Sequence, residues 1–258
     1  MLHPRIIPCL LVKNKGLVKT TRFKNPVYVG DPINAVRIFN DKQADELLIV
    51  DIDATVEGKE PDYQMIEHWA SECRMPLGYG GGIKTTDQAM RIFSLGVEKV
   101  AVSAAVINNP EIISAIAKQA GSQSIAVVID VKKKLFGGYE VCTHNGKTYT
   151  GKNPVELATQ AEDAGAGEII INSIDHDGMM KGYDVNLVDI IRQKISLPIT
   201  VLGGAGSLED MGLLIKKFGI IGAAAGSLFV FKGVHKAVLI NYPGEFEKEQ
   251  LFRDNLSG

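Results

Sequence analysis

A carboxylate at the end of an apolar run is the group in this sequence best placed for acid–base chemistry. Asp130 follows the run Ile125–Ile129, so its side chain would lie where a buried strand ends. A partly buried carboxyl group can have a raised pKa and act as an acid or a base. The alternative is that Asp130 only caps the following loop. Asp51 and Asp177 also follow apolar runs, and each could contact a ligand or bind loop backbone instead.

Two glycine-rich turns are the second sign of chemistry. Gly80-Gly81-Gly82 and Gly203-Gly204-Ala205-Gly206 each follow an apolar run and enter a helical pattern through Thr85 or Ser207. Such a unit presents backbone N–H groups and a helix N-terminus to a phosphate. Glycine pairs also end strands for backbone reasons alone, because glycine accepts positive φ. Two turns half a chain apart nevertheless favour a small ligand with a phosphate at each end.

Alternating elements along the whole chain must position these residues. Apolar, β-branched runs predict eight strands, at 5–12, 46–52, 76–80, 99–103, 124–131, 168–174, 198–202 and 220–225. Helical patterns lie at 32–43, 62–74, 85–95, 109–120, 153–164, 185–194, 207–217 and about 232–240. Continuous apolar strands suit a parallel sheet covered by helices. We predict an α/β fold, a single (β/α)8 TIM barrel domain over residues 1–258, rather than an open doubly wound sheet.

In such a barrel the ligand binds at the carboxyl ends of the strands, with phosphate often held after strands 7 and 8. The run Ala224-Ala225-Gly226-Ser227 supports a phosphate site there. The residues predicted to bind ligand or phosphate are Asp51, Gly81, Gly82, Ser103, Asp177, Gly178, Gly203, Gly204, Gly226 and Ser227.

Two segments interrupt the alternation. Residues 13–31 are basic and rich in Gly and Thr, and they predict a long mobile loop that carries Lys19 over the barrel mouth. Lys19 could reach an anionic substrate, or the segment could be only a solvated loop. Residues 132–151 alternate apolar and polar around Gly137-Gly138 and Asn145-Gly146, which predicts an inserted β-hairpin.

The two halves of the chain resemble each other. Asp53 and Asp175, Asp62 and Asp184, and Gly81 and Gly203 are each 122 residues apart. These correspondences favour a barrel built from two duplicated half-barrels over chance similarity among βα units.

Four strands begin with a charged residue, two of each sign. They are Arg5, Glu46, Lys99 and Glu168. The simpler interpretation is a salt-bridged closure of the barrel at the end opposite the mouth. The other is a gate or a docking surface.

Composition narrows the classes of partner. The net charge of -2 argues against nucleic acid or an anionic membrane as the main partner. The three cysteines are scattered and form no CxxC or Cys/His cluster, so we expect no zinc or other metal, no disulfide framework and no cofactor. No run is long enough to span a membrane, and we expect a cytoplasmic protein.

Taken together, these residues resemble the cyclase subunit of imidazole glycerol phosphate synthase. The likeness runs from Arg5 to Phe231 and rests on Gly30-Asp31-Pro32, Ala44-Asp45-Glu46-Leu47, Gly80-Gly81-Gly82-Ile83, Gly121-Ser122-Gln123, Gly165-Ala166-Gly167-Glu168, Asp175-His176-Asp177-Gly178 and Gly203-Gly204-Ala205-Gly206-Ser207. The resemblance implies a duplicated half-barrel that forms a heterodimer with a glutaminase subunit and takes ammonia from it through the barrel. It also implies addition of that ammonia to a doubly phosphorylated ribulosyl-formimino nucleotide, as a lyase of histidine biosynthesis.

The resemblance assigns roles to particular residues. Arg5, Glu46, Lys99 and Glu168 match the family's ammonia gate, at the face that docks the glutaminase. Lys19 matches a mobile-loop lysine, and Asp130 matches one of two catalytic aspartates.

The sequence departs from the family at the other aspartate. The family's first strand ends Cys-Leu-Asp-Val, whereas this chain has Cys9-Leu10-Leu11-Val12. Leu11 has no titratable proton, so chemistry that needs two carboxylates should be lost. The turn at Ser103 is also shortened, which weakens phosphate contact there.

This sequence keeps the residues of the ammonia gate but has lost one of the cyclase aspartates. In this combination it resembles second-copy subunits found with bacterial surface-polysaccharide genes. Those are thought to deliver ammonia to a sugar amidotransferase that makes an acetamidino sugar. Three alternatives stay open: a working cyclase of histidine biosynthesis, a non-catalytic barrel that docks and activates the glutaminase, and a sugar-phosphate isomerase barrel. The isomerase has neither a glutaminase partner nor a charged gate.

Overall fold

Eight parallel strands close on themselves around one axis in the computed structural model, which describes residues 3–233 and 235–256. They are β1 (Arg5–Lys13), β4 (Leu47–Asp51), β5 (Leu77–Gly80), β6 (Lys99–Val102), β7 (Ile125–Lys133), β10 (Glu168–Ser173), β11 (Ile199–Leu202) and β12 (Gly222–Ala225). β1 pairs with β12 and with β4, and β10 pairs with β7, so the ring of strands is closed. The predicted (β/α)8 barrel is confirmed.

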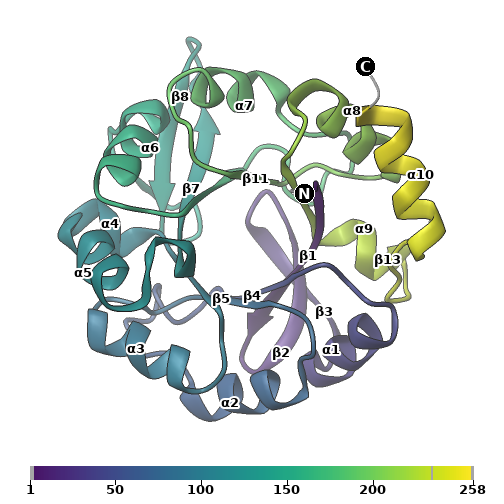
Figure 1. The fold of residues 1–258 in the computed structure, drawn as a ribbon, viewed down its shortest axis with the longest axis horizontal. Coiled ribbons are helices and arrows are strands. Elements are labelled where there is room, and N and C mark those ends of the chain that lie inside the picture. Colours follow the sequence, from purple (N-terminus) through teal and green to yellow (C-terminus); the bar gives the residue numbers. More distant parts are fainter. Residues whose placement is uncertain (1–2, 234, 257–258) are drawn as a thin grey trace.

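Helices surround the barrel (Figure 1). They are α1 (Pro32–Asp41), α2 (Tyr63–Glu72), α3 (Thr86–Ser94), α4 (Ala104–Asn108), α5 (Glu111–Ala120), η1 (Ser122–Ser124), α6 (Pro154–Asp163), α7 (Val185–Arg192), α8 (Leu208–Phe218), α9 (Ser227–Val230) and α10 (Glu245–Leu256). No helix within residues 3–233 and 235–256 is both long enough and apolar enough to cross a bilayer.

Helix N-caps repeat between the two halves. The side chains of Asp31, Asp62 and Thr85 cap α1, α2 and α3, and those of Asn153, Asp184 and Ser207 cap α6, α7 and α8. Each pair is 122 residues apart. Such a cap bonds an otherwise unpaired N–H of the first helical turn. A capping side chain therefore starts each helix at the equivalent position in both halves, as expected for a duplicated half-barrel.

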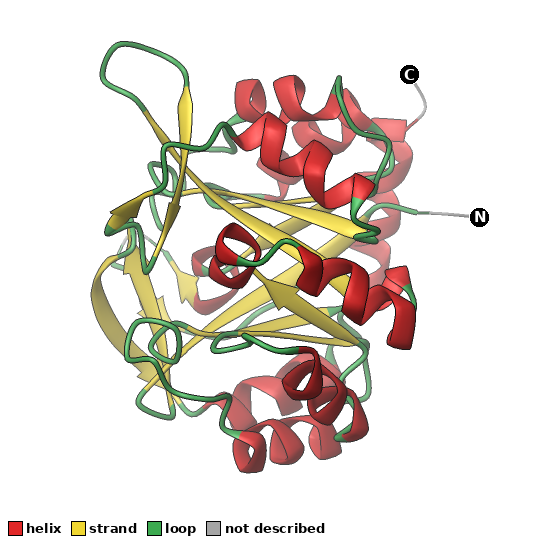
Figure 2. Ribbon diagram, turned by 90° about the vertical axis from the view of Figure 1, so that its left-hand side faces the viewer, coloured by secondary structure: helices red, strands yellow, loops and turns green. Residues whose placement is uncertain are grey.

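Two β-hairpins stand at the carboxyl ends of the barrel strands, on the left of Figure 2. β2 (Gly16–Thr21) pairs antiparallel with β1 and with β3 (Lys24–Gly30). The prediction of a loop over residues 13–31 is therefore wrong, because this segment continues the sheet from β1. Residues 132–151 contain β8 (Tyr139–Thr143) and β9 (Thr148–Tyr149), with β8 antiparallel to the end of β7 and to β9.

The C-terminal part also differs from the prediction. No helix forms at 232–240 within the described residues. Instead β13 (Phe231–Lys232) pairs with β14 (Ala237–Val238), and α10 follows. α10 packs beside α8, where Gly212 leaves room for Asn255 (Figure 1).

Strand residues alternate between two apolar layers, as the two-residue period of a strand requires. Ile6 and Leu10 of β1 face outward into the core under the helices. Ile7 and Cys9 face inward, into a small cluster on the barrel axis with Leu48, Ala101, Ala126, Ile170 and Ala224. This inner cluster separates the two ends of the barrel.

Candidate active site and charged ring

A cavity of about 460 Å³ opens at the carboxyl ends of the barrel strands. Every residue that the sequence predicted for catalysis or ligand binding lines it: Lys19, Asp51, Gly81, Gly82, Ser103, Asp130, Asp177, Gly178, Gly203, Gly204, Gly226 and Ser227. Parallel strands bring residues from distant parts of the chain to one end of the barrel. One site therefore contains both glycine turns and the candidate acid–base residue.

Asp130 forms a polar pair with Asn172. The two residues lie in register on β7 and β10, and Nδ2 of Asn172 donates to Oδ1 of Asp130 at 2.9 Å. Burial raises the pKa of Asp130 to about 7, against the lowering effect of this hydrogen bond. A carboxyl group of that pKa can both accept and release a proton near neutral pH.

Leu11 occupies the place on β1 that Asp130 occupies on β7. It lies in register with Val50 of β4, just as Asp130 lies in register with Asn172. Leu11 and Val50 both line the cavity and pack against the inner cluster. The mouth therefore has a hydrogen-bonded polar pair in one half-barrel and an apolar pair in the other.

Lys19 is directed into the barrel by β2. Its side chain is buried, and Nζ donates to the carbonyl oxygen of Cys9 at 2.7 Å. Burial lowers the pKa of Lys19, although Cys9 and Asp177 act in the opposite direction. Gly226 makes room for the ammonium, since a Cβ built at Gly226 would lie 2.5 Å from Nζ. The lysine is thus next to the turn that was predicted to hold a phosphate.

Asp177 fastens the β2–β3 hairpin over the mouth. Its Oδ2 accepts from the Thr20 hydroxyl at 2.7 Å and from the Phe23 amide at 3.1 Å. Its carbonyl accepts from the Arg22 amide at 2.9 Å. Burial raises the pKa of Asp177, opposed by the two hydrogen bonds to the carboxylate and by Lys19. Of the two roles open for Asp177, binding loop groups is the one that these contacts show.

Asp51 makes the same kind of local contact. Its Oδ1 accepts from the amides of Asp53 and Ala54 at 2.9 and 3.1 Å, and burial raises its pKa. Asp53 is held in turn by Lys13, whose Nζ lies 2.7 Å from Oδ1. These bonds fix the loop after β4 along the cavity wall.

Both glycine turns need glycine. Gly81 and Gly82 have φ of 119° and 72°, and Gly203 and Gly204 have φ of 88° and 123°. A Cβ on Gly204 would also lie 2.1 Å from the carbonyl oxygen of Gly182. The turns lead into α3 and α8, which both begin with a capping box. This geometry leaves backbone close to the cavity, where it can approach an anion.

Several cavity residues were not predicted. They include Thr20, Phe23, Thr55, His144, Asn145 and Asn172. The sequence could have indicated Asn172, because it is a polar residue directly after the apolar run Ile169–Ile171. No sequence pattern indicated Asn145 as a cavity residue. Its Nδ2 donates to the carbonyl of Ile52 at 2.9 Å only because the β8–β9 turn folds back over the mouth.

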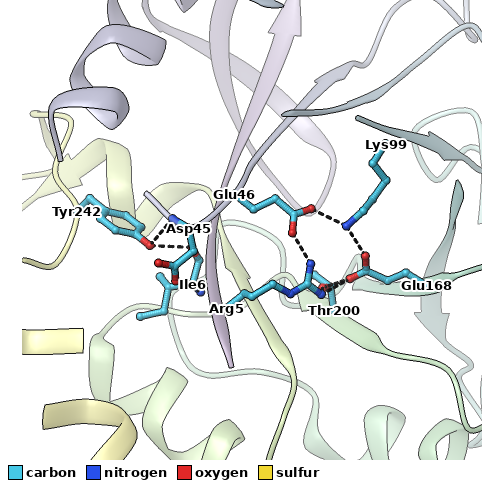
Figure 3. Close-up of polar contacts among 8 residues, drawn as sticks. All are labelled: Arg5, Ile6, Asp45, Glu46, Lys99, Glu168, Thr200 and Tyr242. Atoms are coloured by element: carbon cyan, nitrogen blue, oxygen red, sulfur yellow. Dashed lines mark hydrogen bonds and ion pairs between the residues drawn. The ribbon is translucent and has the colours of Figure 1, made fainter. Parts of the chain in front are cut away.

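The four charged residues at the strand starts form a closed ring at the opposite end of the barrel (Figure 3). Lys99 Nζ lies 2.7 Å from Glu46 and 2.6 Å from Glu168. Arg5 pairs with Glu168 at 2.7 Å and also with Glu46. We call Arg5, Glu46, Lys99 and Glu168 the charged ring.

The ring carboxylates are buried but compensated. Burial alone would raise the pKa of Glu168, yet Lys99 and Arg5 outweigh it and hold that pKa below its usual value. The Thr200 hydroxyl also donates to Glu168. Removal of either cation would therefore leave buried negative charge with one partner fewer.

The cavity ends one layer above the charged ring. Its deepest lining includes Leu48, Ala101 and Ile170, which follow Glu46, Lys99 and Glu168 by two residues. Two residues along a strand return to the same face about 6.6 Å further on. The ring, the apolar inner cluster and the cavity are thus stacked along the barrel axis.

The described residues contain no group of three or more His, Cys, Asp or Glu side chains arranged to hold a metal ion.

The chain is similar to known proteins over most of its length. The model of a family described as "Histidine biosynthesis protein" matches residues 5–235. A Leptospira interrogans protein, provisionally named imidazole glycerol phosphate synthase subunit HisF, is 58% identical over 98% of this chain and 100% of its own length. Two similarly named proteins are hisF3 of Vibrio vulnificus, 55% identical over 97% of this chain and 96% of the relative, and hisF2 of Pseudomonas aeruginosa, 51% identical over 94% and 97%.

Proposed function

The chain belongs to the histidine biosynthesis protein family as a HisF-type cyclase subunit of imidazole glycerol phosphate synthase, and we propose that it passes ammonia from a glutaminase subunit through its barrel. The stacking of the charged ring, the apolar inner cluster and the cavity carries this proposal. The ring would be the inlet, at the face where the glutaminase docks in a heterodimer. The cavity would be the outlet.

The chemistry of this path suits neutral ammonia. An apolar interior lined by Ala101, Ala126 and Ala224 disfavours ammonium strongly, because an unpaired ion there loses its hydration. Ammonia can pass only if the ring opens. Lys99 is the member best suited to move, since its single nitrogen makes both contacts and its stem is flexible. Arg5 binds both glutamates with two nitrogens and is harder to displace.

Cyclase chemistry is the part that we propose is lost or strongly reduced. Asp130 keeps a suitable pKa and Lys19 is present, but the place equivalent to Asp130 is filled by Leu11. At the place equivalent to Asp130 and Asn172, a reaction that needs a second carboxylate finds Leu11 and Val50. Asp51 also lines the cavity, but its Oδ1 is held by the amides of Asp53 and Ala54. The two phosphate turns would then hold a doubly phosphorylated ligand without efficient conversion.

The ammonia would serve another acceptor. The names hisF2 and hisF3 given to two relatives denote additional copies of the subunit in their organisms, which supports a role apart from histidine synthesis. We propose that this chain, with its glutaminase, supplies ammonia to a sugar amidotransferase that forms an acetamidino sugar of a surface polysaccharide. The cytoplasm is the compartment proposed for it.

Deletion of the gene in its own organism tests this function. The surface polysaccharide of the deletion strain should lack amidated sugar by mass spectrometry, and the strain should still grow without histidine. Wild-type chain should restore amidation. Unchanged amidation, or a histidine requirement, would contradict the proposal. Restoration by Asp130→Asn as good as by wild type would show that Asp130 has no part in delivery.

One observation favours a second candidate, a working cyclase of histidine biosynthesis. All predicted phosphate-binding glycines, Lys19 and Asp130 still share one cavity. Complementation of a strain that lacks its histidine-pathway cyclase separates the candidates, because only a working cyclase would allow growth without histidine.

A further inference from the structure

A gap in the barrel's hydrogen bonding lies beside the charged ring. The first residues of β1 pair with β12 from Arg5 to Pro8, but β1 pairs with β4 only from Cys9 onward. In a parallel strand alternate residues face alternate neighbours, so Ile6 directs its N–H and C=O toward β4. Pro8 has no N–H. Ile6 is therefore the residue whose backbone groups would lack a partner where the barrel begins.

Two side chains fill this gap (Figure 3). Asp45 Oδ2 accepts from the Ile6 amide at 2.9 Å. The Tyr242 hydroxyl donates to the Ile6 carbonyl at 2.9 Å and accepts from the Asp45 amide at 3.1 Å. One hydroxyl thus bridges the ends of β1 and β4, each one residue away from a ring member, Arg5 or Glu46.

The bridge comes from the C-terminal segment, beyond the residues 5–235 that the family model matches. Tyr242 is buried, and its ring packs against Phe39 and Phe229 at centroid distances of 6.3 and 5.4 Å. Burial raises the pKa of Tyr242, so its hydroxyl keeps the proton it donates. Lys248 of α10 forms an ion pair with Asp45, the other residue of the bridge, with Nζ 2.6 Å from Oδ1.

From these contacts we infer that Tyr242 and Asp45 are positioning residues for the charged ring. They hold the starts of β1 and β4 at the spacing that lets Arg5 reach Glu46. Without them the two strand ends separate, because the paired register of β1 with β4 begins only at Cys9. The C-terminal segment thereby sets how tightly the inlet is closed. This consequence for ammonia rests on the proposed function, whereas the positioning of Arg5 does not.

The test compares two tyrosines that each lose a buried hydroxyl. Tyr242→Phe keeps the aromatic packing and removes the bridge. Tyr183→Phe is the matched control, because the Tyr183 hydroxyl donates to the Ala224 carbonyl at 3.0 Å, away from the ring. The readout is the signals of the Arg5 Nη–H groups in ¹⁵N NMR, assigned with Arg5→Lys, and their rate of exchange with water, because these nitrogens donate to Glu46 and Glu168.

Exchange of the Arg5 Nη–H groups should accelerate at least tenfold in Tyr242→Phe and stay within twofold of wild type in Tyr183→Phe. Asp45→Ala, which removes the other half of the bridge, should act like Tyr242→Phe and serves if that variant does not fold. If both tyrosine variants lose a similar amount of Tm and the Arg5 exchange rate does not change, Tyr242 contributes only to general packing. That result would overturn the inference. Since this signal needs no ammonia, a failure of glutamine-dependent delivery with the expected NMR result would contradict the proposed function alone.

Discussion

Leu11 and Asp130 occupy equivalent positions on the first strands of the two half-barrels, yet only Asp130 can carry a proton. Asp130 is bonded to Asn172, while Leu11 lies beside Val50. The duplication that places a glycine turn in each half of the cavity is thus not matched by a carboxyl group at position 11. The ammonia passage that we propose needs no such pair, whereas we expect cyclisation to need one.

Replacement of Leu11 by aspartate should partly restore cyclase chemistry. The new carboxylate would face the cavity opposite Asp130 and raise ammonium-dependent turnover of the histidine-pathway nucleotide by at least tenfold, as general acid–base groups contribute at least that much. The same change should lower the free energy of unfolding by about 1–3 kcal/mol, because a polar group is placed against Val50. Leu11→Asn is the control with similar polarity and no titratable proton. Equal turnover in both variants would show that the missing proton carrier is not what limits the reaction.

Asp130 should make stability depend on pH. Its pKa is raised to about 7 by burial, so between about pH 4 and pH 7 the folded state binds a proton that the unfolded state releases. The free energy of unfolding should therefore fall as pH rises through this range and level off above it. Asp130→Asn should remove this dependence and become the more stable form at pH 8. Urea unfolding at pH 4.5, 6 and 8 measures it, and parallel curves for the two proteins would contradict it.

Loss of Lys99 should destabilise the barrel through its ring. Lys99→Met leaves Glu46 and Glu168 with Arg5 as their shared cation, and we expect a loss of about 3 kcal/mol in urea unfolding. Lys217→Met is the matched control, because its partnership with Asp189 is solvent-exposed and should be worth less than about 1 kcal/mol. Equal losses would mean that the ring contributes no more than a surface pair.

The β2–β3 hairpin should become more mobile when its hydrogen bonds to Asp177 are removed. Asp177→Ala removes the acceptor for Thr20 and Phe23. We expect hydrogen exchange over residues 16–30 to accelerate about tenfold or more, since each hydrogen bond to a charged group contributes about 1.5–3 kcal/mol. Asp175→Ala offers a comparison, because its side chain accepts from Lys133 instead of the hairpin. Unchanged exchange over the hairpin in Asp177→Ala would show that other contacts hold it.

Gly204 should tolerate no side chain, for a steric reason beyond its backbone angle. Gly204→Ala would place Cβ against the Gly182 carbonyl, so we expect a loss of more than about 2 kcal/mol. Gly219 also has positive φ, at 71°, but open space around it, so Gly219→Ala meets backbone strain alone and should cost less than Gly204→Ala. Equal effects on thermal unfolding would leave backbone strain as the whole cause.

Much of the barrel was predictable because short stretches of sequence determine its strands and helix starts. Apolar runs such as Ile125–Ile129 mark strands, and caps such as Asp62 and Asp184 mark helix starts at a fixed offset. Residues at strand ends then meet because parallel strands in a closed barrel share two rims. That rule alone brought the charged ring and the cavity residues together.

What could not be predicted depends on pairing across long separations. The segment 16–30 contains Pro26 and several charges, and it becomes β2 and β3 only because β1 extends beyond the barrel to pair with it. Tyr242 meets Ile6 from the other end of the chain, and no periodic pattern announces such a contact. The hydrogen bond of Asn172 to Asp130 likewise needs the register of β7 with β10.

The most direct test is turnover of the doubly phosphorylated ribulosyl-formimino nucleotide by the purified chain with its glutaminase, with ammonium or glutamine as nitrogen source. We expect little or no imidazole glycerol phosphate from either source. Turnover near that of an ordinary histidine-pathway cyclase, measured side by side, would contradict it.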